Sequence, residues 1–427
     1  MSDDSPTPAV PVYHAVGVGA GPANLSLAAL FESSSTEQIA LFDRQPGPAW
    51  HNQLLHRGVR MQTSWLKDLV SLVDPTHELS FLNYLVTTGR TYALLNAQFD
   101  FMPRREYVRY LAWAAERLHN VHYGVTIDRI SFGDGGFVVG ADGRTLARSE
   151  HLVIGVGSRP ALPPAFAQLP APRVFIADEL ARRIDAMAVD RDAPVGVVGG
   201  RQTGVEAVLR LLNAGFTNIS WFGRRLWFET MDDSPNANDV YRPSHAEALQ
   251  RLSPPTRRRV IKELRPTGDA LTPGVMRALY QANYDGLLEL GRFPVTLYPA
   301  RDVIAGALVG DDIVLTAQTP ETRETHHVRH VVIAAGRETV DVPFDDELRD
   351  RIEVDDNGEI VVETDYSVRW KGMNGHRIYA LNRAATTLGI TDSNLTMLPV
   401  RSAIVLNSMF GREIFSVRDE LSPVNWG

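Results

Sequence analysis

The stretch that decides the fold is VYHAVGVGAGPANLSLAAL, residues 12–30, in which a valine-rich run, a glycine-rich turn and an alanine- and leucine-rich helix follow one another. In this order the turn can seat a pyrophosphate at the N-terminus of the helix. Asp43 ends the next predicted strand, where a carboxylate would accept hydrogen bonds from ribose hydroxyls. The residues expected to bind this first dinucleotide are Gly19, Gly21, Pro22, Asn24 and Asp43.

A second strand-to-helix turn of the same kind occurs in VGVVGGRQTGVEAVLRLL, residues 195–212. Arg201 stands where the middle glycine is expected. The next predicted strand ends in Arg224 and Arg225 in place of an acid, and guanidinium groups bind the 2′-phosphate that an acid would repel. NADPH is therefore expected here and FAD at the first turn. The residues predicted to bind NADPH are Gly199, Gly200, Arg201, Gln202, Thr203, Arg224 and Arg225.

The composition narrows the class of protein. At 427 residues, with 44% hydrophobic and 22% charged residues, the chain is expected to form two or three globular domains. The net charge of −8 and the lack of a long basic tract argue against a nucleic-acid partner. The absence of cysteine excludes disulfides, thiolate metal sites and the disulfide reductases. No metal centre is expected.

The N-terminal segment MSDDSPTPAVPVYH is acidic and proline-rich, and it lacks the basic start and apolar core of a secretory signal. No window reaches about 18 uninterrupted apolar residues, so no membrane span is expected. These features predict a cytoplasmic protein without a membrane partner.

Several blocks resemble the flavin-dependent N-hydroxylating monooxygenases, the enzymes that hydroxylate the side-chain amine of lysine or ornithine, or a diamine, for hydroxamate siderophores and related metabolites. The blocks follow the family's order and cover nearly the whole chain. MQTSWLKDLV is the most specific, because generic flavoproteins lack it. The blocks are GVGAGPANLSLAAL (17–30), MQTSWLKDLVSLVDPT (61–76), SFLNYLV (80–86), DDSPNAND (232–239) and TDSNLTMLPVRSA (391–403).

The resemblance implies a reaction and a set of partners. NADPH reduces FAD, O2 adds to the reduced flavin as a hydroperoxide, and the neutral amine attacks the distal oxygen. The implied partners are O2 and a small amino acid or amine. The family also implies a homo-oligomer, usually a tetramer.

The same resemblance implies the remaining site residues. Lys67 matches the lysine that binds the substrate's carboxylate, and forms that act on diamines tend to lack it. Gln62 and Asn283 are the implied catalytic residues. Further implied cofactor-binding residues are Trp50, His51, Gln62, Asn382 and Leu395. The implied substrate-binding residues are Lys67, Asn238, Asn283, Asn394 and Thr396.

The expected fold is α/β, with two Rossmann-like doubly wound dinucleotide-binding domains, for FAD and NADPH, and a smaller, mostly helical substrate-binding segment. The FAD domain is expected to be discontinuous, over residues 1–190 and 335–427. The NADPH domain is expected over residues 191–334, with the helical substrate-binding insertion at about 230–292.

The predicted activity is N-hydroxylation of a terminal amine, with lysine favoured over ornithine. Asn283 in YQANYD is similar to the ornithine forms, whereas GDALTPGVMRALY and VDPT are similar to the lysine forms. Three alternatives stay open. They are an N-hydroxylase of a diamine such as cadaverine or putrescine, a Baeyer–Villiger or heteroatom flavin monooxygenase, and a nucleotide-sensing regulator, the last because Arg201 and Leu388 depart from the family pattern.

Overall fold

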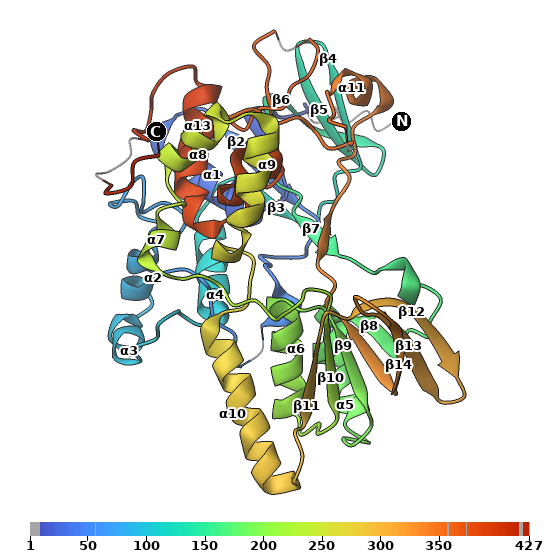
Figure 1. Ribbon diagram of the computed structural model, residues 1–427. Helices are drawn as coiled ribbons and strands as arrows, with labels where there is room; N and C mark the ends of the chain where they lie inside the picture. Colours follow the sequence, from blue (N-terminus) through green and yellow to red (C-terminus); the bar gives the residue numbers. More distant parts are fainter. Residues whose placement is uncertain (1–8, 56, 357, 373, 418–421, 427) are drawn as a thin grey trace, which may run out of the picture.

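The two ends of the chain build the first sheet of the computed structural model, which describes residues 9–55, 57–356, 358–372, 374–417 and 422–426 (Figure 1). The strand order is β3-β2-β1-β6-β5-β4, and β17 also pairs with β6. The strands are β1 (Val12–Val18), β2 (Ile39–Asp43), β3 (Val121–Tyr123), β4 (Arg129–Gly133), β5 (Gly136–Ala141), β6 (Arg144–Ile154) and β17 (Ile378–Ala380). All pairs are parallel except β4–β5 and β5–β6.

The crossover helix α1 packs beside the C-terminal helix α13, where Ser402 Oγ donates to Ser26 Oγ at 2.9 Å. Both helices are buried along most of their length because they lie between the sheet and other helices. The helices of this first unit are α1 (Pro22–Ser34), α2 (Phe81–Thr87), α3 (Thr91–Asn96), α4 (Arg104–Ala115), α11 (Asp346–Arg351), α12 (Ala385–Leu388) and α13 (Leu398–Met409).

A second, fully parallel sheet has the order β11-β10-β9-β15-β8. Its strands are β8 (Val174–Ile176), β9 (Val195–Val198), β10 (Ile219–Gly223), β11 (Val295–Pro299) and β15 (His330–Ile333). Helices α5 (Leu180–Met187), α6 (Gln202–Asn213) and α10 (Pro273–Leu290) belong to this second unit. The antiparallel strands β12 (Asp302–Val309), β13 (Asp312–Gln318) and β14 (Arg323–Val328) share a separate apolar cluster with the sheet. The expected α/β fold with two dinucleotide-binding units is confirmed.

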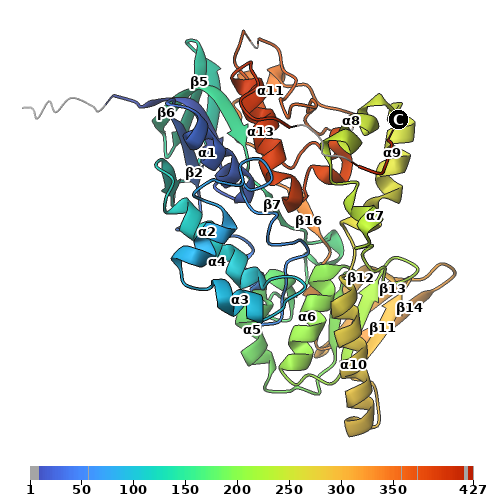
Figure 2. The same ribbon diagram turned by 90° about the vertical axis from the view of Figure 1, so that its left-hand side faces the viewer.

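The chain passes between the two units through the antiparallel pair β7 (Ser158–Pro160) and β16 (Arg337–Thr339), which lies between the two sheets (Figure 2). Because β8 pairs with β15, the second unit begins soon after β7, and the expected boundary at residue 191 is wrong. The cause is that β8 is only three residues long and lies in a proline-rich crossover, so it carries no hydrophobic periodicity.

The helical insertion is shorter than expected. The backbone N–H of Met231 donates to the carbonyl of Leu271 at 2.7 Å, which closes the base of the insertion. Helix α10 then packs against α6 and belongs to the second unit. We call residues 231–272 the substrate segment; its helices are α7 (Pro235–Asn238), α8 (Pro243–Arg251) and α9 (Pro254–Glu263). No helix in the described ranges is long and apolar enough to cross a membrane.

A buried ion pair joins the two units. Arg104, at the start of α4, donates to Glu206 of α6 through two nitrogens, at 2.9 and 3.2 Å, and the side chains are only 12% and 4% exposed. Gln202 Nε2 donates to the same carboxylate at 2.9 Å, while Gln202 Oε1 accepts from the backbone N–H of Thr272 at 3.0 Å. One connected network therefore links the first unit, the second unit and the end of the substrate segment.

We predict that Glu206→Gln lowers stability far more than a matched surface change. The substitution leaves the Arg104 cation buried without a counter-charge, which costs about 3–5 kcal/mol. Glu179→Gln breaks the partly exposed Glu179–Arg183 pair (2.5 Å) and should cost below about 1 kcal/mol. Thermal and urea unfolding of the two variants measures the difference, and equal losses would contradict a special role for the buried pair.

Candidate active site

The first glycine turn has the geometry of a phosphate seat. Gly19 adopts φ +97°, and a Cβ there would collide with the carbonyl oxygen of Gly155, so only glycine fits. Gly21 caps α1 without a side-chain hydrogen bond, and the first turn of the helix has no acidic residue. The helix N–H groups are therefore available to an anion. Asp43 accepts from the backbone N–H of Ala20 at 2.7 Å, which places its carboxylate beside the turn.

Asn24 supports this turn from inside. Its side chain is buried, and Nδ2 donates to the carbonyl of Gly19 at 2.7 Å. The side chain of Asn24 therefore fixes the backbone of the first turn, and Asn24 stays a predicted cofactor-binding residue through this support.

The second turn also fits a dinucleotide. Gly199 adopts φ +136°, and a Cβ on Gly204 would collide with the carbonyl oxygen of Gly199. Arg224 and Arg225 follow the end of β10, where the adenosine ribose of a dinucleotide lies in this fold. Arg225 forms an ion pair with Glu229, four residues further along the chain. The donors and the positive charge suit a phosphorylated nucleotide.

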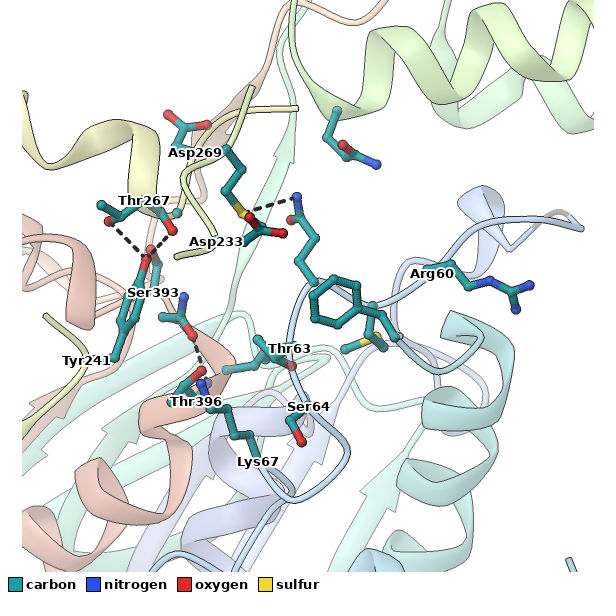
Figure 3. Close-up of a pocket in the computed structure, with 18 of the residues that line it drawn as sticks. Arg60, Thr63, Ser64, Lys67, Asp233, Tyr241, Thr267, Asp269, Ser393 and Thr396 are labelled. Atoms are coloured by element: carbon teal, nitrogen blue, oxygen red, sulfur yellow. Dashed lines mark hydrogen bonds between the residues drawn. The ribbon is translucent and has the colours of Figure 1, made fainter. Parts of the chain in front are cut away.

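A cavity of about 460 Å³ lies between the first unit, the second unit and the substrate segment. Figure 3 shows Lys67 and Thr396 towards one side of it and Asp269 towards the other. The predicted site residues that the structure brings together here are Trp50, His51, Gln62, Lys67, Gln202, Thr203, Asn238, Asn394, Leu395 and Thr396. Sequence reasoning missed Arg104, Glu206, Tyr241 and Asp269, which also line it.

Lys67 is a partly buried cation whose hydrogen-bond partner is an uncharged amide. Its Nζ donates to Asn238 Oδ1 at 3.3 Å. Burial lowers the pKa of Lys67 from its usual value, because a charged group loses hydration there. Within the described residues no carboxylate forms an ion pair with Lys67, so its charge is available to a ligand.

The wall of the cavity beyond Lys67 is held by local hydrogen bonds. Asn394 Oδ1 accepts from the backbone N–H of Thr396 at 2.8 Å and so caps the short helical turn there. Tyr241 OH donates to the carbonyl of Thr267 at 2.9 Å. Gln62 Nε2 points towards Met231 Sδ at 3.9 Å, a weak contact that leaves its amide able to bind a ligand.

His51 is a neutral group at the edge of the cavity. Burial, together with the nearby charges of Arg337 and Arg104, lowers the pKa of His51 to about 4. Its imidazole therefore carries no charge at neutral pH and can accept or donate one hydrogen bond at each nitrogen.

Of the site residues that the family resemblance implies, Asn283 and Asn382 do not line the cavity. The amide of Asn283 is buried, and both of its polar atoms have backbone partners, because Nδ2 donates to the carbonyl of Val295 at 2.9 Å and Oδ1 accepts from the Val295 N–H at 3.0 Å. The expected catalytic and substrate-binding role of Asn283 is therefore corrected: it ties α10 to β11. Asn382 follows β17 with φ +62°, and its Oδ1 accepts from Arg401 Nη1 at 2.8 Å.

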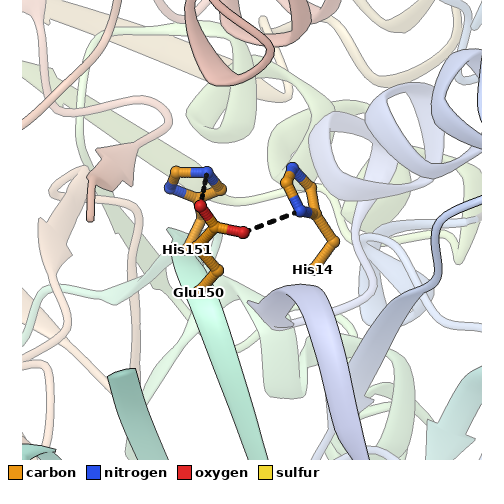
Figure 4. A group of neighbouring side chains, drawn as sticks. All are labelled: His14, Glu150 and His151. Atoms are coloured by element: carbon orange, nitrogen blue, oxygen red, sulfur yellow. Dashed lines mark ion pairs between the residues drawn. The ribbon is translucent and has the colours of Figure 1, made fainter. Parts of the chain in front are cut away.

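One group of described side chains has donors of the kind that bind metals, namely His14, Glu150 and His151 at the sheet of the first unit (Figure 4). His151 Nδ1 accepts from the backbone N–H of Arg377 at 3.2 Å, so the neutral ring carries its proton on Nε2, which faces Glu150 at 3.8 Å. A metal-binding histidine normally donates from its second nitrogen. The hydrogen bonding therefore favours a structural cluster over a metal site.

Two glycine turns of the dinucleotide-binding type, the second of which contributes Gln202 and Thr203 to the cavity, define a protein that binds two dinucleotides, and the known proteins that the chain is similar to narrow this class. The family described as L-lysine 6-monooxygenase/L-ornithine 5-monooxygenase matches residues 11–339. The chain is 29% identical to L-lysine N6-monooxygenase of Escherichia coli over 421 residues, which cover 96% of this chain and 97% of that protein.

Solved structures agree with this assignment. The ornithine N-hydroxylase of Kutzneria sp. 744, determined with reduced FAD, NADP+ and L-ornithine, superposes with a TM-score of 0.84 at 26% identity, over 94% of this chain and 99% of that one. The FAD-bound cadaverine monooxygenase of Erwinia amylovora superposes with a TM-score of 0.90 at 22% identity, over 97% and 98%.

The chain belongs to the L-lysine 6-monooxygenase/L-ornithine 5-monooxygenase family. It is an amine N-hydroxylating flavin monooxygenase whose cofactors are FAD and NADPH.

We propose that Arg224 and Arg225 bind the 2′-phosphate of NADPH. Replacing both with alanine should raise the KM for NADPH by about tenfold or more and change the KM for NADH little, because only NADPH carries that phosphate. Arg323→Ala, on strand β14, serves as the control and should leave both constants unchanged. Equal effects on the two cofactors would contradict the assignment.

Proposed function

We propose that the enzyme N-hydroxylates the side-chain amine of L-lysine, with L-ornithine as the nearest competitor, in a pathway to a hydroxamate siderophore or a related metabolite. The observation that carries the choice of an amino acid is the ammonium of Lys67, which faces the cavity without an ion-pair partner among the described residues. A carboxylate is the natural partner of such a cation, whereas the distal ammonium of a diamine would be repelled.

The rest of the sequence makes Lys67 stand out. Only three of the 43 basic side chains are lysines, namely Lys67, Lys262 and Lys371. The chain uses arginine almost everywhere that it needs a positive charge, yet a lysine occupies the cavity. A compact ammonium on a flexible stem suits a single carboxylate in a narrow space, whereas a planar guanidinium needs a wider one.

The contacts of Asn238, Asn394 and Thr396 support a role for each of them in binding the substrate. Asn238 orients Lys67 through its Oδ1 and offers the rest of its amide to the substrate. Asn394 fixes the backbone of Thr396, whose hydroxyl faces the same end of the cavity as Lys67 (Figure 3). Bound NADPH supplies hydride, and reduced FAD supplies the electrons that activate O2. The protein orients the amine and leaves it neutral.

A diamine is the second candidate. Asp233 lines the cavity, and its carboxylate points into it in the view of Figure 3. A free carboxylate would attract the second ammonium of cadaverine or putrescine. The charge of Lys67 argues against a diamine, because it would repel the second ammonium. The enzyme's preference between amino acids and diamines is therefore the measurement that separates the two proposed substrate classes.

The test is a hydroxylamine assay with lysine, ornithine, cadaverine and putrescine, with NADPH oxidation followed in parallel. We predict that the native enzyme prefers lysine and that Lys67→Ala lowers kcat/KM for lysine and ornithine by about 10- to 100-fold, since a charged hydrogen bond is lost. The values for the two diamines should stay level or rise.

Lys262→Ala is the matched control, because Lys262 is an exposed lysine on α9. It should leave all four substrates unchanged. If Lys67→Ala kept the native preference for amino acids, Lys67 would lose the proposed role; if no amine gave a hydroxylamine, the proposed function itself would be wrong.

The pH dependence should come from the substrate amine. Only the neutral amine is a nucleophile, so hydroxylamine formation should fall from about pH 8 to about pH 6, by up to about tenfold per unit. His51, with a pKa of about 4, is already neutral across this range and adds no titration of its own. Product formation at saturating NADPH measures the profile. A flat profile, with hydride transfer shown to be faster than product formation, would contradict attack by the amine.

A further inference from the structure

Arg201 connects the NADPH turn with the wall of the active-site cavity. It is the N-cap residue of α6, and its Nη1 forms an ion pair with Asp269 Oδ2 at 2.6 Å. Asp269 lies in the substrate segment and lines the cavity. The pair therefore crosses from the turn that seats the cofactor's phosphates to the segment that covers the substrate.

The carboxylate of Asp269 is shared. Arg265 Nε also contacts Asp269 Oδ2, at 3.1 Å, so two guanidinium groups depend on one oxygen. Burial lowers the pKa of Arg201, and the charges of Arg265, Arg225 and Arg224 lower it further, while the carboxylate of Asp269 opposes the shift. Three of these four arginines form ion pairs with only two acids, Arg201 and Arg265 with Asp269 and Arg225 with Glu229.

Such a cluster has the charge of a site for a phosphate group. It carries an excess of about two positive charges, and a phosphate monoester at neutral pH carries about −1.5 to −2. The same groups surround the N-terminus of α6, whose N–H groups favour an anion. In the structure the Asp269 carboxylate provides the anion that Arg201 contacts.

We propose that Asp269 acts as an internal substitute for a cofactor phosphate, and that bound NADP(H) takes Arg201 away from it. Arg201 then binds the cofactor's phosphate only when its ion pair with Asp269 is broken. Asp269 in turn lowers the affinity for the cofactor. The phosphate is either the 2′-phosphate, beside Arg224 and Arg225, or the diphosphate at the start of α6. The inference concerns the affinity for NADP(H) and does not depend on which amine is hydroxylated.

The test is a set of NADP+ dissociation constants for the flavin-loaded protein, measured by calorimetry. Arg201→Ala should weaken NADP+ by about tenfold, because a charge-assisted hydrogen bond is lost. Asp269→Asn should tighten NADP+ by about threefold to fivefold, because a partly exposed ion pair no longer competes. Asp239→Asn is the matched control: it breaks the Asp239–Arg242 pair (2.8 Å) in the same segment and should leave the constant unchanged.

The double variant decides the mechanism. If Asp269 acts through Arg201, Asp269→Asn has no effect in a protein that already carries Arg201→Ala. If removing Asp269 tightens NADP+ equally with and without Arg201, only the general electrostatic field has changed and the proposal is overturned. It is also overturned if Asp269→Asn weakens the native protein's binding or leaves it unchanged.

NAD+ distinguishes the two phosphates. An effect of Asp269→Asn on NADP+ alone assigns Arg201 to the 2′-phosphate, whereas the same effect on NAD+ assigns it to the diphosphate. Flavin content and thermal unfolding verify that each variant is folded. Because these are binding constants, a failed amine assay leaves them interpretable, and a failed binding test leaves the N-hydroxylation test intact.

Discussion

The Arg104–Glu206 ion pair is the contact on which the active site depends, because the cavity lies between two units that only two segments of the chain connect. The chain crosses between the sheets through β7 and β16 alone, and each is a three-residue strand. Two cofactors that exchange a hydride must meet with their reactive atoms a few ångströms apart. A bidentate pair has a narrow geometric optimum, so it fixes orientation as well as distance.

The first turn of α6 takes part in three different sets of contacts. Its N–H groups are the donors we propose for the second cofactor's phosphates, Gln202 joins Glu206 to Thr272, and Arg201 joins Asp269. Both polar atoms of the Gln202 side chain thus have partners, which holds this amide between Glu206 and Thr272. One helical turn therefore contacts the substrate segment, the second unit and the ion pair with Arg104. Binding of a cofactor at this turn can change the contacts of all three.

The sequence was sufficient to predict the features whose geometry is set by residues close together in the chain. Both glycine turns combine a strand, a special backbone geometry and a helix within about 20 residues, so they could be predicted. Lys67 and Asn238 came from the family resemblance, since they lie far apart in the chain and meet only in the fold. Asn283 was misassigned because a motif cannot show that Val295 occupies both of its amide atoms. Arg104 and Glu206 were missed for the same reason, because a charge in an amphipathic helix gives no sign of its partner.

Arg201 shows which glycines of such a turn are required by the backbone and which by the ligand. Gly199 has φ +136°, and Gly204 has no room for a Cβ beside the Gly199 carbonyl. Arg201 has φ −119° and ψ −172°, an extended conformation that any residue adopts. The turn therefore keeps its shape with an arginine at this position. A glycine is needed there only to let a phosphate approach the backbone closely, and an arginine that can itself bind the phosphate changes how the anion is held while leaving the turn intact.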